Sequence, residues 1–157
     1  MPVRAARAAV ALAAAAAMLL ASGCEVFESK EAREVERATK TSSAGATCAA
    51  KATAAPVPAG FPSAFRLPDS AIVTGSEKRS EGRLIVYAVT SQGVKETLAF
   101  LQKSLPEAGL RLSAGEVEEH DAESDWSGEG YRGRWAIREL PQCDGDTLIT
   151  VLAAKAG

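Results

Sequence analysis

The pattern of apolar and polar positions predicts five β-strands after residue 60. Uninterrupted apolar runs at Leu84–Val89 and Leu148–Ala153 are typical of strands buried on both faces. The segment Tyr131–Arg138 alternates between apolar and polar residues, which predicts a strand with one apolar face. Shorter stretches predict two more strands, one at Ala71–Thr74 and one that runs from Leu110 to Glu119.

One segment between these strands has helical periodicity. Its apolar stripe has spacings of 4, 3 and 4 residues and consists of Val94, Leu98, Leu101 and Leu105. Thr90 or Ser91 offers an N-terminal cap, and we expect the helix to extend to about Ser104. The order β-β-α-β-β-β predicts a single small α+β domain over residues 61–157, in which one helix packs on an antiparallel sheet.

A single helix leaves one face of this sheet without a cover. The two uninterrupted strands present apolar side chains to both faces, and large uncovered apolar patches are rare on soluble monomers. We therefore expect something to cover the second face. Three alternatives stay open, namely the segment Phe61–Leu67, a second copy of the chain, and a ligand.

The first 24 residues have the pattern of an export signal. Two arginines precede an uncharged, mostly apolar run at positions 8–21, which is shorter than the roughly 20 residues needed to span a bilayer. The run ends in the sequence LASGC, which resembles the lipobox of bacterial lipoproteins, with Ala21 where leucine is more usual. The resemblance implies a signal peptide at residues 1–23 and a diacylglycerol on Cys24, which would anchor the chain on the extracytoplasmic face of a cell membrane. Ordinary secretion after cleavage of the same leader is the alternative.

Two polar segments separate the leader from the domain. Residues 25–40 mix acids and bases with few apolar residues, which favours a short, solvated helix near the membrane. A docking face on that helix is the alternative. Residues 41–60 are rich in Ala, Ser, Thr and Pro, and they predict a flexible linker. Residues 24–60 are thus expected to form a lipidated N-terminus, a polar helix and a tether.

Two cysteines remain once Cys24 carries lipid. Outside the cytoplasm paired thiols tend to oxidise, so we expect a disulfide between Cys48 and Cys143. These residues are 95 positions apart, and the chain-entropy model gives such a bond about 4.5 kcal/mol of stabilisation. The bond would pin part of the linker onto the domain, whereas two unpaired surface thiols are the alternative.

Charge excludes some partners and suggests others. The 157 residues carry 18 bases and 20 acids, so they lack the basic excess of a nucleic-acid-binding protein. Without the two leader arginines the formal charge falls from −2 to −4, which gives no overall attraction to anionic lipid. The polar face of the alternating strand carries Arg132, Arg134 and Arg138. This row either pairs with neighbouring acids or receives an anionic partner, such as a wall polymer or an acidic peptide.

The residues between Gly115 and Glu129 include seven acids and no base. Three of the acids match the first ligand positions of an EF-hand loop, but Trp126 stands where that loop needs glycine and Arg132 where it needs glutamate. We therefore expect a solvated acidic hairpin loop and no metal or other cofactor. The single histidine, His120, lies among these acids, and we expect it to be a surface residue and not a catalytic base.

The domain also resembles the small C-terminal domains of uncharacterised bacterial envelope lipoproteins. The matching stretches are Leu67–Ala71, Thr97–Gly109 and Tyr131–Val151. They are structural residues, and the resemblance supplies no catalytic residue. It implies a lipid-anchored, non-catalytic binding or accessory module of the cell envelope, with an envelope protein or anionic polymer as partner. A structural homodimer and a small envelope hydrolase are the alternatives.

Overall fold

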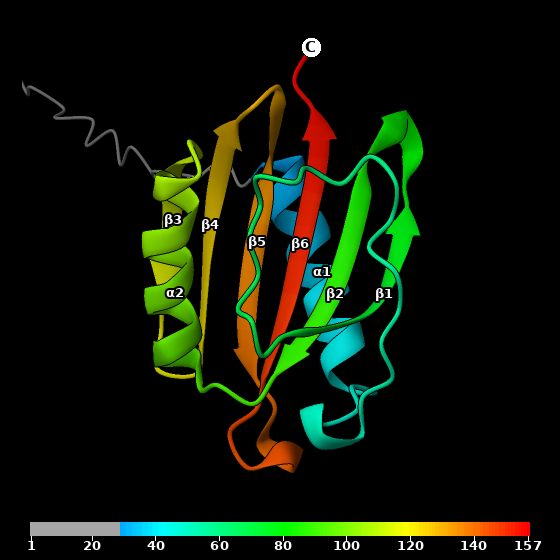
Figure 1. Ribbon diagram of the computed structural model, residues 1–157, viewed down its shortest axis with the longest axis vertical. Helices are drawn as coiled ribbons and strands as arrows, with labels where there is room; N and C mark the ends of the chain where they lie inside the picture. The colour runs from blue at the N-terminus through cyan, green and yellow to red at the C-terminus, as the bar shows by residue number, and fades with distance from the viewer. Residues whose placement is uncertain (1–28) are drawn as a thin grey trace, which may run out of the picture.

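Residues 29–157 are described by a computed structural model, in which a six-stranded antiparallel sheet lies between two helices (Figure 1). The predicted α+β class and antiparallel sheet are confirmed. The helices are α1 (Lys30–Ser43) and α2 (Val94–Glu107), with short 3₁₀ helices η1 (Ala49–Lys51), η2 (Ser80–Gly82) and η3 (Pro141–Cys143). The strands are β1 (Ile72–Lys78), β2 (Leu84–Thr90), β3 (Arg111–Val117), β4 (Asp121–Gly128), β5 (Tyr131–Glu139) and β6 (Thr147–Lys155).

The strand order β1-β2-β6-β5-β4-β3 places the two most apolar strands, β2 and β6, inside the sheet. They pair in register from Leu84 with Ala153 to Thr90 with Thr147. Every residue of β2 is buried, and so is every residue of β6 except Lys155. The uninterrupted apolar runs therefore belong to strands that are covered on both faces, as predicted.

Helix α2 and the segment Phe61–Leu67 cover one face of the sheet (Figure 1). Their core is built from large side chains, among which Trp126, Trp135 and Leu101 are almost fully buried. The ring of Phe65 lies 5.1 Å from that of Trp126, measured between ring centroids. The segment Phe61–Leu67 thus packs on the same face as the predicted helix, and it does not cover the second face.

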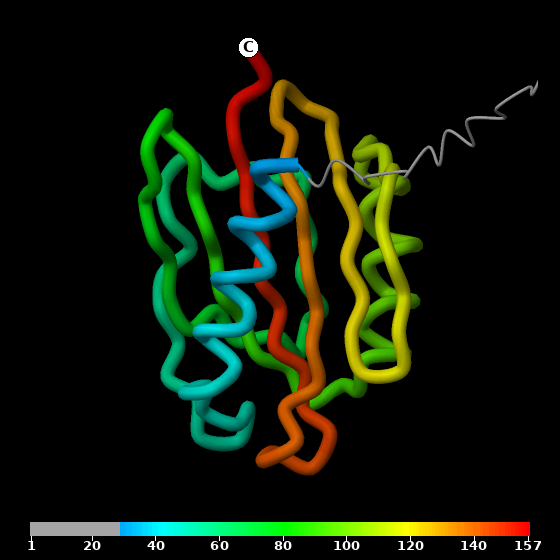
Figure 2. Tube along the Cα trace, turned by 180° about the vertical axis from the view of Figure 1, so that it is seen from behind, coloured from blue at the N-terminus to red at the C-terminus, as the bar shows by residue number. Residues whose placement is uncertain are grey.

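Helix α1 covers that second face, which corrects the prediction of a solvated helix (Figure 2). Val35 and Ala38 pack against Ile85, Tyr87 and Leu152, and Val35 is fully buried. The docking-face alternative was therefore right, and the partner is the protein's own sheet. The uncovered face that motivated a second copy or a ligand does not exist in the described part of the chain.

The segment 41–60, predicted as a flexible linker, is also part of the folded body. It completes α1, forms η1 with the buried Ala49, and then runs beside the edge strand β1. There the backbone N–H of Ala55 donates to the carbonyl oxygen of Val73 at 2.7 Å. The linker prediction failed because small side chains need little apolar area when a disulfide and backbone hydrogen bonds hold them in place.

The acidic segment before residue 129 is a strand hairpin and not a solvated loop, so the sheet has six strands where five were predicted. Strand β4 alternates acids with buried residues, and its residues Ala122, Ser124 and Trp126 are the buried ones. This period-2 pattern is that of a half-buried strand. The many acids led to the prediction of a solvated loop. They are compatible with a strand because arginines on β5 compensate their charges.

The predicted helix is confirmed with shifted ends. Thr90 is the last residue of β2, so the N-cap position is Gly93, which has no capping side chain. The helix continues to Glu107 with Pro106 in its last turn. Its buried residues include Leu101 and Leu105 of the predicted stripe.

Candidate functional site

A groove of about 370 Å³ lies between α1 and the β1–β2 hairpin. It exists because α1 packs mainly over β5 and β6, so that the edge strand β1 stays largely exposed on the far side of the groove. Five cations and two carboxylates line the groove, namely Lys30, Arg33, Arg37, Arg79, Arg83, Glu34 and Glu77. Its wall is therefore positive, although the whole chain has a formal charge of −2.

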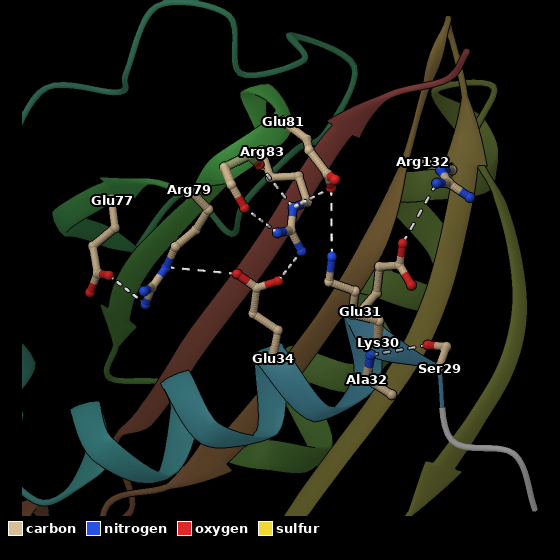
Figure 3. A network of polar contacts seen from close by, with 11 residues as sticks. Ser29, Lys30, Glu31, Ala32, Glu34, Glu77, Arg79, Glu81, Arg83 and Arg132 are labelled. Carbon is tan, nitrogen blue, oxygen red and sulfur yellow. Dashed lines mark hydrogen bonds and ion pairs between the residues drawn. The ribbon is translucent and has the colours of Figure 1, made fainter.

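An ion-pair network joins α1 to the hairpin along this groove (Figure 3). The guanidinium of Arg83 is ion-paired with Glu34 of α1, and its Nε and second terminal nitrogen donate to Ser80 at 3.1 Å and 2.9 Å. The same Glu34 carboxylate lies 3.7 Å from Nε of Arg79. Because the Arg83 side chain is only 8% exposed, this pairing is shielded from solvent and fixes the width of the groove.

The hydroxyl of Tyr87 is held in place by a hydrogen bond in the lining of the groove. Its hydroxyl donates to Oε1 of Glu77 at 2.9 Å, and Glu77 also pairs with Arg79 at 2.6 Å. Burial, and then the hydrogen bond with Glu77, raises the pKa of the Tyr87 hydroxyl above its usual value. A tyrosine hydroxyl is protonated at neutral pH, and this shift of the pKa favours the protonated form further.

Two arginines on the groove side of α1 have no ionic partner in the described part of the chain. Arg33 and Arg37 lie one helical turn apart, both are exposed, and no carboxylate of residues 29–157 is within 4 Å of either guanidinium. Two guanidinium groups on one helix flank can bind the oxygens of a carboxylate, phosphate or sulfate.

A second cavity of about 450 Å³ adjoins the groove and shares Thr41, Ser42 and Tyr87 with it. Hydroxyl groups of Thr47 and Thr74 also line this cavity. The combined surface thus offers cations at one end and hydroxyl groups at the other. This arrangement suits a ligand with acidic and hydroxyl groups.

The arginine row of β5, considered above as an anion-binding surface, is paired within the protein. Arg134 is ion-paired with Glu123 and with Asp125, the latter at 2.7 Å. Although burial opposes the charged form of Arg134, hydrogen bonds to the two carboxylates outweigh it and raise the pKa of the guanidinium. Arg138 lies 3.5 Å from Asp121, and Arg132 lies 3.6 Å from Glu31 of α1. Of the two alternatives for this row, the structure contains the pairing with neighbouring acids, and the row does not line the groove.

His120 lies at the surface, outside the groove. Its Nδ1 is 2.5 Å from a carboxylate oxygen of Glu139, and this hydrogen bond raises the pKa of the imidazole. The side chain is 68% exposed. The pair lies beside the C-terminal end of α1, where Ser43 and Ala44 line the same open cavity of about 790 Å³.

The predicted disulfide between Cys48 and Cys143 is confirmed, with the two Cα atoms 5.3 Å apart. It joins the segment after α1 to η3, and the neighbouring N–H of Ala49 donates to Oδ2 of Asp146 at 2.7 Å. Both sulfur atoms are bonded to each other, so this cluster of Cys48, Cys143 and Asp146 offers no thiolate for a metal.

The proposed lipid attachment residue, Cys24, lies outside the described residues, as does the signal peptide. Within residues 29–157, each helix is too short or too polar to traverse a bilayer. Comparison of the chain with protein-family models, with curated proteins and with solved structures found no match.

Sequence reasoning missed the groove because its charges come from two segments that were not expected to meet. A signal was nevertheless present, because Arg33 and Arg37 have the i,i+4 spacing of one helix flank. Val35 and Ala38 mark the adjacent flank as buried. The spacing alone does not reveal that Arg79 and Arg83 lie opposite.

Proposed function

We propose that this protein is a lipid-anchored, extracytoplasmic accessory module of the bacterial cell envelope, which binds an anionic partner in the groove beside α1. The anchor in this proposal is a diacylglycerol on Cys24. The module binds its partner and does not transform it.

The observation that carries the proposal is the Cys48–Cys143 disulfide. Disulfides persist in oxidising compartments and are rare in the cytosol. The apolar leader that ends in LASGC accounts for how the chain reaches such a compartment. The disulfide and the export leader therefore both support an extracytoplasmic location.

The groove supports binding of an anion more than any other activity. Arg33 and Arg37 are exposed without ionic partners in residues 29–157, while Arg79 and Arg83 are held in place by Glu34. Fixed cations next to free cations form a preorganised site for an acidic group. An anionic envelope polymer or an acidic segment of an envelope protein has that chemistry.

Metabolic labelling with a fatty-acid analogue tests the anchor. Cells that express the chain should contain labelled protein, and Cys24→Ser should abolish the label without affecting the disulfide. Labelled and unlabelled protein should both carry the Cys48–Cys143 bond, as measured by the mass shift on reduction and alkylation. A wild-type mature protein without label would contradict the lipid-anchored function.

Retention on purified envelope tests the groove. We expect Arg33→Gln with Arg37→Gln to weaken retention of the released protein by on the order of tenfold, because two charge-assisted contacts are lost. The matched control is Arg66→Gln with Arg111→Gln, two arginines that are also exposed but lie outside the groove. Equal losses in the two pairs, or no loss in either, would contradict binding at the groove.

A further inference from the structure

We propose that one end of the sheet, at the tip of the β1–β2 hairpin and the end of β6, docks onto the anionic phospholipid headgroups of the membrane that holds the anchor. This docking surface is formed by Lys78, Arg79, Arg83 and Lys155 around an apolar floor. The inference rests on the proposed lipid at Cys24, and it adds an orientation for the folded body and a class of lipid.

The start of α1 lies at this end of the molecule. Nζ of Lys30 is 3.7 Å from Glu81 in the hairpin tip, and Glu31 is 3.6 Å from Arg132 at the start of β5. Figures 1 and 2 place the start of α1, the hairpin tip and the C-terminus at the same end, while η1 and η3 lie at the opposite end.

The short chain between Cys24 and α1 keeps this end of the molecule close to the proposed anchor. Five residue steps separate Cys24 from Ser29, the N-cap of α1, and a fully extended chain covers at most about 17 Å in five steps. The nine residues of β6 extend about 30 Å from one end of the sheet to the other. The hairpin end is therefore within reach of the headgroups, whereas the disulfide end lies about a sheet length farther along the molecule.

The surface at the hairpin end has the charge and shape for an anionic headgroup. A cavity of about 270 Å³ opens there, with four basic residues and no carboxylate in its lining. Glu34 and Glu77 pair with the two arginines, and Glu81 of the hairpin tip lies 3.8 Å from Arg83. Lys78 and Lys155 are exposed and have no carboxylate of residues 29–157 within 4 Å.

Leu84 and Tyr131 are part of the apolar floor of this cavity. A phospholipid presents an anionic phosphate next to an apolar glycerol ester region, which complements cations around an apolar floor. The mature chain has a formal charge of −4, but this net value conceals the local excess of cations. Because the anchor keeps the surface near the bilayer, a few weak contacts are enough to orient the domain.

Lysine reactivity on vesicles tests the proposal. The chain from Cys24 onward, which contains every described residue, is coupled through the Cys24 thiol to a maleimide lipid, since the other two cysteines form the disulfide. Acylation of individual lysines by a membrane-impermeant reagent is then measured by mass spectrometry. The vesicles consist of phosphatidylcholine alone or also contain phosphatidylglycerol.

We expect Lys78 and Lys155 to be acylated about fivefold more slowly on the phosphatidylglycerol vesicles, and added salt to remove the difference. Lys51 in η1 and Lys95 at the start of α2 belong to the opposite end and should keep their rates. Lys155→Gln should weaken the protection of Lys78, whereas the matched Lys95→Gln should leave it unchanged.

Equal acylation ratios for all four lysines, or protection of Lys51 and Lys95 instead, would overturn the docking surface. Because the lipid is attached chemically, this result does not depend on whether cells lipidate Cys24. The labelling experiment decides that separate question, so failure of the anchor and failure of the docking surface give different observations.

Discussion

The two faces of the sheet are covered in different ways. On the α2 face, aromatic rings and leucines fill the space, and Phe65, Trp126 and Leu101 are buried together. On the α1 face the helix contributes small side chains such as Val35 and Ala38, and ion pairs surround them. The first layer thus rests on large apolar burial, whereas the second combines modest burial with charge pairing and a disulfide.

This difference assigns most of the stability to one face of the sheet and the proposed binding site to the other. Large buried side chains stabilise the α2 layer but leave little polar surface for a ligand. The thinner α1 layer leaves a groove beside it, where Arg83 and Tyr87 are held at fixed positions. Binding surfaces are commonly drawn from the less stable parts of a fold. The α1 face is therefore the side on which we place the partner.

Loss of the disulfide should have the largest effect. Cys48→Ser with Cys143→Ser removes a bond that closes 95 residues, and we expect the free energy of unfolding to fall by about 4.5 kcal/mol. Urea denaturation measures this change. Cys24→Ser is the matched control and should leave the free energy unchanged, and an equally stable double variant would show that the bond does not hold the α1 layer.

Truncation on the α2 face should rank second. Leu101 is fully buried, and Leu101→Ala should lower the free energy of unfolding by about 3 kcal/mol because it removes apolar contacts and leaves a cavity. Leu98 is only partly buried, so the matched substitution Leu98→Ala should lower the free energy of unfolding by less. Equal losses at both positions would argue against the packing described for α2.

Truncation on the α1 face should cost less. Val35 is also fully buried, but it is smaller, so Val35→Ala should lower the free energy of unfolding by about 1.5 kcal/mol. Arg33→Ala on the exposed side of the helix should have almost no effect. If Val35→Ala were as neutral as Arg33→Ala in chemical denaturation, α1 would not be packed on the sheet.

The smallest effect should come from His120, at the edge of the α1 layer. Its pKa is raised by Glu139, so the charged pair stabilises the fold below the ordinary imidazole pKa near 6.5, and this contribution is lost as pH rises through the raised value. His120→Gln should flatten the dependence of the unfolding midpoint on pH in that range. A wild-type midpoint that rises there would have the wrong sign for this pair.

The sequence identified the elements in which apolar periodicity is strong. The stripe through Leu101 and Leu105 predicted α2, and the runs at 84–89 and 148–153 predicted the inner strands. It did not identify α1 as a packed helix, since alanine and valine positions among so many charges resemble a solvated helix. The strand β4 was missed for a related reason, because the arginines that compensate its acids lie on another strand.

The candidate site was predicted only in part. The number of cysteines and the expected export to an oxidising compartment were enough to predict the Cys48–Cys143 disulfide. The groove depends on Glu34 meeting Arg83 across 49 residues of sequence, which no local pattern reveals. Such long-range charge pairs follow from the topology of the fold. That topology could not be predicted from the sequence without recognising that α1 packs on the sheet.

Amide hydrogen exchange along α1 in the disulfide-bonded protein tests the central claim most directly, namely that residues 30–43 form the second layer of the fold and not a tether. The account predicts slow exchange at Val35, Ala38 and Thr39, and a marked acceleration at these amides in the Cys48→Ser, Cys143→Ser variant. Exchange of these amides at the rate of an unstructured chain, while those of α2 stay protected, would contradict it.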